Sequence, residues 1–203
     1  MGTRNLTCVY LDGEYKVAQY GQWYGYPEGQ GVTCLDFLRN KMHGEDRFKA
    51  RVRSMKFASQ DYIKGIFAAY GVKCGLASIE TANIIKTFFP QFHRDTAANI
   101  LEMIDTQNIG EYLENSIEFA ADSLFCEWAY VIDLDKRTFE AYKGFNQEPL
   151  TEDDRFFFLE EKSYEEHRGE DQYHPVKLVK SWSLDELPTV DEFLNAFKKE
   201  EEE

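Results

Sequence analysis

The sequence predicts an α+β protein with a layered, mostly antiparallel sheet, built on two hairpins with helices packed against it. Two stretches, 4–20 and 128–142, combine β-branched and aromatic residues around short turn signals. The residues between them, from 45 to 123, are mainly at helical spacing. Two hairpins separated by helices indicate helices layered on one sheet system.

The first hairpin turns at Asp12 and Gly13, a dipeptide that readily takes the positive φ of a tight turn. Its first strand is apolar at both parities, with Leu6 and Cys8 on one side and Val9 on the other. A strand of this kind needs cover on both faces. We therefore expect it to lie centrally in the sheet.

The segment that follows, residues 21–31, reads GQWYGYPEGQG and contains four glycines, three aromatic rings and a proline. We interpret it as a loop. A helix is predicted from Val32, with apolar residues at helical spacing as far as Met42 and a stop at Gly44. Further helices are predicted up to about Ser123, one of them ended by Pro90.

The second hairpin runs from Trp128 to Leu134, turns at 135–137 and returns over 138–142. Beyond it, two stretches are predicted as short edge strands: RFFFLEE at 155–161 and HPVKLVKSW at 174–182. A last helix is predicted from about Thr189, and it leads into the acidic residues that end the sequence.

We interpret the 203 residues as a single domain, because 43% of them are hydrophobic and suffice for one core. Its predicted parts are a hairpin, glycine-aromatic loop and helix (1–44), a helical segment (45–123), a second hairpin with edge strands (124–180), and a C-terminal helix with an acidic tail (181–203).

Acidic residues outnumber basic ones by 37 to 23, which gives a formal net charge of −14. We expect no nucleic-acid partner, because binding to phosphates requires an excess of lysine and arginine. An acidic surface usually serves solubility, although it also suits a basic partner. The densest basic run, 47–56, could hold phosphates but is more typical of a solvated helix face.

The cysteines form no CxxC pair and stand among apolar or helical residues, which predicts buried thiols in a reducing compartment. They are Cys8, Cys34, Cys74 and Cys126. The N-terminus lacks the apolar segment of a signal peptide, and no apolar run approaches the ~20 residues that span a bilayer. We expect a cytoplasmic protein without a membrane partner.

No cofactor and no metal are expected. Neither GxGxxG nor GxxxxGK[ST] occurs, and no two histidines stand at metal-ligand spacing. Asp133 and Asp135 alternate with apolar residues at a strand end. They could bind a metal or act as acid and base, but aspartates in such a place more often cap a turn.

The candidate ligand site is the loop at 21–31. Its rings could stack a flat molecule, its glycines would permit close backbone approach, and free N–H groups of the helix behind it would attract a carboxylate or phosphate. Amide and carboxylate groups add hydrogen bonds, and an arginine at the adjacent strand start adds charge. The predicted site residues are Arg4, Gln22, Trp23, Tyr24, Tyr26, Glu28 and Gln30. The alternative is a packed turn whose rings cap the hairpin.

Two stretches carry a resemblance: MGTRNLT…LDGEYKVAQYGQW-GYPEGQG at 1–31 and DSLFCEWAYVIDLDKRTFEAYKGF at 122–145. They are similar to a family of uncharacterised proteins met in bacteria, their phages and some fungi. The family form of the loop is QWDGYPEGQG, so Tyr24 stands where that family has aspartate. The resemblance implies no activity, and its phage members suggest an accessory or immune-evasion role.

A second resemblance concerns the order of elements. A short start, a buried strand, a hairpin, a glycine loop and a helix resemble the entry into the αββα sandwich of N-terminal-nucleophile hydrolases. In those enzymes the first residue after processing supplies both nucleophile and base. Here removal of Met1 would expose Gly2, which carries no nucleophile.

Three functional hypotheses follow. The first is a binding protein for a planar, anionic small molecule such as a nucleotide derivative, acting by sequestration or immune evasion. The second is a hydrolase with an N-terminal-nucleophile-like fold. The third is an acidic protein inhibitor that acts through its surface.

Overall fold

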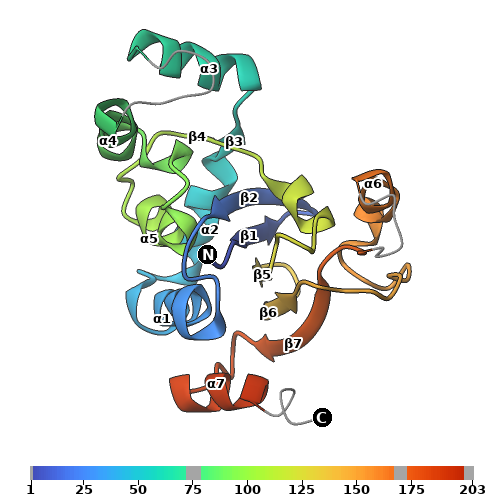
Figure 1. The fold of residues 1–203 in the computed structure, drawn as a ribbon. Coiled ribbons are helices and arrows are strands. Elements are labelled where there is room, and N and C mark those ends of the chain that lie inside the picture. The colour runs from blue at the N-terminus through green and yellow to red at the C-terminus, as the bar shows by residue number, and fades with distance from the viewer. Residues whose placement is uncertain (1, 72–78, 167–172, 199–203) are drawn as a thin grey trace.

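The computed structural model describes residues 2–71, 79–166 and 173–198 (Figure 1). Its main element is a five-stranded sheet with the strand order β2-β1-β5-β6-β7. The strands are β1 (Asn5–Leu11), β2 (Glu14–Gly21), β5 (Trp128–Asp133), β6 (Thr138–Lys143) and β7 (Lys177–Ser183). Neighbouring strands are antiparallel except β1 and β5, which are parallel. Both predicted hairpins are present, and the sheet as a whole is mixed.

The two hairpin turns are capped by aspartates. Asp12 and Gly13 take φ values of 56° and 81°, and their N–H groups donate to the Asp135 carboxylate at 3.0 and 2.9 Å. In the second turn, the N–H groups of Asp135 and Lys136 donate to Oδ1 of Asp133 at 3.0 and 2.7 Å. Turn capping by Asp133 and Asp135 is therefore confirmed, and Asp135 also ties the two turns together.

Short helices fill most of the remaining chain. The α-helices are α1 (Val32–Asp36), α2 (Glu45–Ser54), α3 (Gln60–Ala69), α4 (Ile79–Phe88), α5 (Ile100–Asp105), α6 (Glu160–Glu166) and α7 (Val190–Lys198). The predicted helical segment 45–123 also contains a two-stranded parallel pair, β3 (Lys56–Phe57) with β4 (Tyr112–Leu113). α4 ends before Pro90, as the sequence predicts, because proline disfavours helix in the residue before it.

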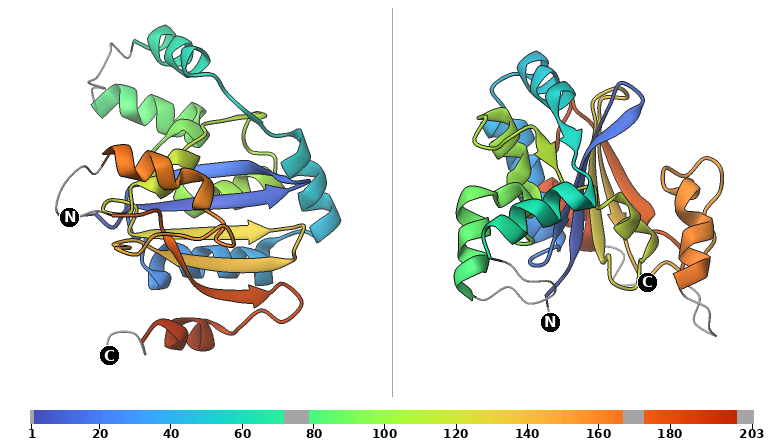
Figure 2. Two further views of the ribbon diagram at one scale, coloured as in Figure 1. Left: turned by 90° about the vertical axis from the view of Figure 1, so that its right-hand side faces the viewer. Right: turned by 90° about the horizontal axis from the view of Figure 1, so that it is seen from above.

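Helices cover both faces of the sheet. One face packs on α1, α2, α5 and α7, and the other is covered by α6 and the short turns near it (Figure 2). Val9 of β1 belongs to the first core, whereas Leu6 and Cys8 belong to the second. The predicted cover on both faces of β1 is thus confirmed. β1 is an interior strand, but the central position belongs to β5.

One predicted edge strand is present and the other is wrong. The stretch 174–182 contains β7, which forms one edge of the sheet. The stretch 155–161 instead begins with a turn at Arg155 and Phe156 and continues as η6 (Phe157–Leu159), which leads into α6. Phe156 and Leu159 are buried while Phe157 and Phe158 are exposed, a spacing of three residues that suits a helix and not a strand.

Three of the predicted buried thiols can be placed. Cys8, Cys34 and Cys126 are free and buried, and burial raises the pKa of each. Cys74 lies outside the described residues. In the described ranges, no helix combines the length and apolar character needed to cross a membrane. The same ranges hold no group of three or more His, Cys, Asp or Glu side chains that could hold a metal ion.

Candidate functional site

The glycine-aromatic segment is more helical than predicted. A helical turn, η1 (Pro27–Gly31), runs directly into α1 and then into η2 (Phe37–Lys41). The N–H groups of Gly29 and Gly31 donate to the Tyr26 carbonyl at 2.9 and 3.4 Å, and that of Gln30 donates to the Tyr24 carbonyl at 2.9 Å. The Val32 N–H likewise donates to the Gly29 and Pro27 carbonyls, so the N–H groups where the sequence predicts the helix to begin are not free to bind an anion.

The glycines allow the chain to cross itself. A Cβ atom on Gly29 would lie 2.1 Å from the Tyr24 carbonyl oxygen, and one on Gly25 would lie 2.8 Å from that of Thr3. The Gly25 N–H donates to the same Thr3 oxygen at 2.9 Å. Neither glycine takes a positive φ. Their small size thus serves backbone packing within the protein and not the approach of a ligand.

The three aromatic rings of this segment lie at the surface. Trp23, Tyr24 and Tyr26 are 43%, 75% and 51% exposed. Together with Gly2 and Thr3 they line a hollow of about 500 Å³, which we call the aromatic hollow. The rings are therefore partly open to solvent and are not buried in the core.

Tyr24 takes an uncommon backbone conformation. Its φ is 58°, in the left-handed region that costs a residue with a Cβ atom about 1–2 kcal/mol. Such strain is often found at functional sites, where the surrounding structure maintains it. Here it keeps the most exposed of the three rings at the edge of the aromatic hollow.

The two predicted glutamines hold the segment in place. Gln30 donates through Nε2 to the Trp23 carbonyl at 3.3 Å and accepts from the Ala98 N–H at 3.1 Å. Gln22 accepts from the Tyr20 hydroxyl at 2.7 Å. Neither side chain lines the aromatic hollow.

The predicted charges are also separate from the rings. The Arg4 guanidinium carbon lies 4.6 Å from the centre of the Phe125 ring. The backbone N–H of Arg4 donates to Glu127 Oε1 at 3.3 Å. Glu28 is exposed in the first turn of η1. Among the residues that the structure describes, none that lines the aromatic hollow carries a charged side chain. Of the seven predicted site residues, the structure brings together Trp23, Tyr24 and Tyr26.

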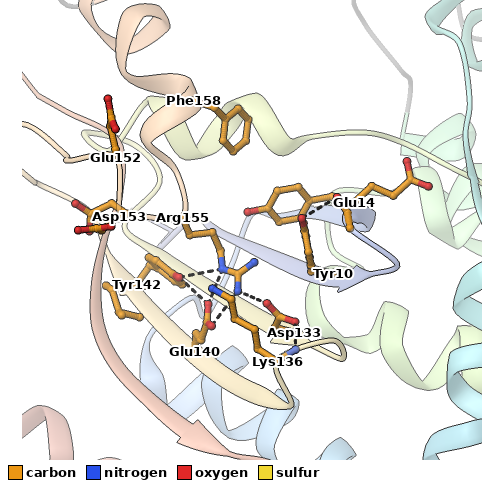
Figure 3. A pocket seen from close by; sticks show the side chains of 14 residues that line it. Tyr10, Glu14, Asp133, Lys136, Glu140, Tyr142, Glu152, Asp153, Arg155 and Phe158 are labelled. Carbon is orange, nitrogen blue, oxygen red and sulfur yellow. Dashed lines mark hydrogen bonds and ion pairs between the residues drawn. The ribbon is translucent and has the colours of Figure 1, made fainter.

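A second pocket lies at the other end of β1, beside the hairpin turns (Figure 3). We call it the charged pocket. Its volume is about 620 Å³. It is lined by Tyr10, Gly13, Glu14, Tyr15, Asp133, Lys136, Glu140, Tyr142, Glu152, Asp153, Asp154, Arg155, Phe158 and Leu178.

Arg155 is the centre of a buried network in this pocket. Its Nε donates to Glu140 Oε2 at 2.7 Å and to the Tyr142 hydroxyl at 3.2 Å, and its Nη2 donates to Glu140 Oε1 at 2.9 Å and to Asp133. The Tyr142 hydroxyl in turn donates to Glu140 at 2.6 Å. The side chains of Asp133, Glu140 and Arg155 are only 0%, 8% and 10% exposed. One buried guanidinium therefore holds two buried carboxylates.

The protonation states of this network follow from its contacts. Burial disfavours the charge on Arg155, but hydrogen bonds to Glu140 and Asp133 outweigh it and raise the Arg155 pKa. Burial, together with the adjacent Glu140 carboxylate, raises the pKa of Tyr142. At neutral pH Arg155 is charged and Tyr142 is a hydrogen-bond donor. The network is thus built to hold charges in place, and neither of these groups is available as a general base.

Most of this network was missed by the sequence analysis. For Asp133 the sequence predicts turn capping, with metal binding or an acid and base role as the alternatives, and no ion pair. Glu140 stands between Phe139 and Ala141 in β6. A carboxylate in a strand that is covered on both faces is rarely buried without a partner, so Glu140 was the residue from which a buried ion pair could have been predicted. Arg155 could have been proposed as its partner, but the stretch that it opens was interpreted as an edge strand.

Comparison of the chain with protein-family models, with curated proteins and with solved structures finds no match in any of the three. The aromatic hollow and the charged pocket are therefore the basis for assigning a function.

Proposed function

We propose that this protein binds a planar small molecule in the aromatic hollow. The observation that supports the proposal most strongly is the convergence of Trp23, Tyr24 and Tyr26, all more than 40% exposed, on one opening. Large rings are more often buried in the core, and clustered exposed apolar groups are typical of binding surfaces.

Stacking is the mode of recognition that these residues favour. Trp23 and Tyr26 offer ring faces to a flat ligand, and the indole N–H and phenol groups offer hydrogen bonds at their edges. The backbone beneath the rings is held by the Gly25 N–H bond to Thr3 and by the tight contact of Gly29 with Tyr24. A rigid floor reduces the entropy that is lost when the ligand binds.

Nucleotide derivatives belong among the ligands to test, because a nucleobase presents the flat face that stacking requires. Since the described lining residues are uncharged, we place the partner of an anionic substituent outside the aromatic hollow. Arg94 is a candidate for that contact, since its carbonyl accepts the Gln22 N–H at 3.0 Å and its side chain is 65% exposed. Binding without turnover would suit a sequestering protein.

The hydrolase alternative receives less support. An αββα sandwich requires two stacked sheets, whereas the described residues form one five-stranded sheet and a two-stranded pair. Gly2 also packs against the Trp23 ring, since a Cβ atom there would lie 2.1 Å from Trp23 Cε3. A nucleophilic side chain at that position would have no space without a shift of the ring.

Mass spectrometry of compounds released by denaturing the purified protein would show whether it retains a planar molecule. Titration with adenine, adenosine monophosphate and riboflavin would follow, in the wild type and in Tyr26→Ala. We expect at least one of these compounds to bind and Tyr26→Ala to weaken it by about 1–3 kcal/mol.

Tyr62→Ala is the matched control, because Tyr62 is a ring of similar exposure (46%) in α3. The proposal is wrong if none of the three compounds binds and none co-purifies. It is equally wrong if Tyr26→Ala and Tyr62→Ala bind the ligand with the same affinity.

A further inference from the structure

We propose that the charged pocket is a second binding site and that its ligand is an organic cation, an amine or a guanidine that carries an apolar group. The site is separate from the aromatic hollow, with which it shares no lining residue. Two features of the charged pocket support this ligand class: its charge and its aromatic walls.

The lining carries an excess of negative charge. Among the residues that the structure describes, six carboxylates and two cations line the charged pocket. Arg155 is bound to two of the carboxylates, Asp133 and Glu140, so the buried network itself has a net negative charge. In the part of the chain that the structure describes, Glu152 and Asp153 are exposed and make no ion pair. The field inside the pocket therefore favours a cation and opposes an anion.

Aromatic rings face the same space. In Figure 3, Phe158 and Tyr10 lie on one side of Arg155 and Glu152 and Asp153 on the other. Phe158 is 59% exposed, although its ring centre is only 6.2 Å from that of Tyr15. A ring face attracts ammonium and guanidinium groups through the cation–π interaction, and the carboxylates across the pocket would add to that attraction.

The pocket already holds one cation in this manner. The Arg155 guanidinium carbon lies 5.1 Å from the centre of the Tyr10 ring, while Asp133 and Glu140 bind its nitrogens. In this protein, a ring and two carboxylates thus bind the guanidinium of Arg155 together. A ligand cation would use the remaining carboxylates and Phe158 in the same way.

The test uses three probes of one shape: phenethylamine as the cation, 2-phenylethanol as the neutral analogue and phenylacetate as the anion. Binding to the full chain would be measured by calorimetry and by chemical-shift changes. We expect phenethylamine to bind about tenfold more tightly than 2-phenylethanol, and phenylacetate not to bind. Equal binding of the cationic and neutral probes, or no binding of phenethylamine, would overturn the proposal.

Variants locate the site. We expect Phe158→Ala, and separately the double variant Glu152→Gln with Asp153→Asn, to weaken phenethylamine binding at least about fivefold. All three residues are exposed, so their replacement should leave the fold intact. Glu186→Gln with Asp191→Asn removes the same charge from exposed residues elsewhere and should leave binding unchanged.

Trp23→Ala separates this proposal from the proposed function. It removes a ring of the aromatic hollow and should leave phenethylamine binding unchanged. If Trp23→Ala abolishes phenethylamine binding while Phe158→Ala has no effect, the cation binds in the aromatic hollow and the second site does not exist.

Discussion

The two ends of β1 are built in opposite ways. At its start, the aromatic hollow places exposed rings on a tightly packed backbone, and its described lining residues are uncharged. At its end, the charged pocket buries Asp133, Glu140 and Arg155 on the sheet and surrounds them with an acidic opening. We expect the side chains of the aromatic hollow to be replaceable with little effect on the fold, whereas replacing the buried network of the charged pocket should destabilise the structure.

The largest effect is expected from Arg155→Met. The substitution leaves the Asp133 and Glu140 carboxylates buried without a cation, and removing one partner of a buried ion pair typically costs about 3–5 kcal/mol. Urea unfolding followed by circular dichroism would measure the loss of stability.

Arg94→Met is the control for this variant, because Arg94 is 65% exposed and its ion-pair distance to Asp95 is 4.0 Å. Adding Asp133→Asn and Glu140→Gln to Arg155→Met should recover part of the lost stability. A loss below about 1 kcal/mol for Arg155→Met would show that the network is not a structural element of the pocket.

A smaller loss is expected in the floor of the aromatic hollow. The Cβ atom of Gly29→Ala would meet the Tyr24 carbonyl oxygen at 2.1 Å, and overpacking of this kind costs ~1–3 kcal/mol. The matched variant Gly65→Ala lies in α3 with no atom near its Cβ, and it should stabilise the protein by ~0.5–1 kcal/mol. Thermal melting would compare the two variants. Similar melting temperatures would show that the backbone around Gly29 is not tightly packed.

The strain at Tyr24 predicts a gain in stability. Tyr24→Gly should raise the free energy of unfolding by about 1 kcal/mol, because glycine adopts a φ of 58° without a steric cost. Tyr26→Gly is the control, since Tyr26 has a φ of −54° and glycine there only adds freedom to the unfolded chain. If both substitutions destabilise the protein equally, Tyr24 is not strained.

The smallest effect concerns alkaline pH. Burial and the Glu140 charge raise the pKa of folded Tyr142, whereas an unfolded tyrosine ionises near pH 10. Unfolding therefore releases a proton in this range, and stability falls as the pH rises, by about 0.4 kcal/mol at pH 10 from this residue. Tyr142→Phe should reduce the difference in stability between pH 8 and pH 10. If Tyr142→Phe leaves the difference in stability between pH 8 and pH 10 unchanged, the pKa of Tyr142 is not raised in the folded protein.

The features that could be predicted from the sequence depend on residues that are close together in the chain. The turn at Asp12 and Gly13 and the alternation in both hairpins involve neighbouring residues, so their strands and caps were foreseen. The rings of the aromatic hollow could be located for the same reason, since Trp23, Tyr24 and Tyr26 are almost consecutive.

The start of the helix was mistaken for a loop because its glycines were interpreted as flexible. The signal for the helix was Pro27, which stands at the first position of η1 and is followed by Glu28. The contacts that require the glycines involve Thr3 and the Tyr24 carbonyl, which only the folded chain brings together.

The charged pocket could not be predicted, because its groups meet through tertiary structure. Asp133 and Glu140 lie in paired strands, but Arg155 reaches them from a segment whose run of three phenylalanines fits a strand or a helix equally well. Once that segment is helical, Arg155 lies over β5 and β6. Sequence spacing alone does not contain this pairing.

Trp23→Ala, measured for both ligand affinity and stability, tests the central claim most directly. If the exposed ring serves binding and not folding, affinity for the ligand of the aromatic hollow should fall by ~1–3 kcal/mol while the free energy of unfolding changes by less than about 1 kcal/mol. The opposite result, a loss of ~3–5 kcal/mol in stability with unchanged affinity, would show that Trp23 is a structural residue and that the aromatic hollow is not the binding site.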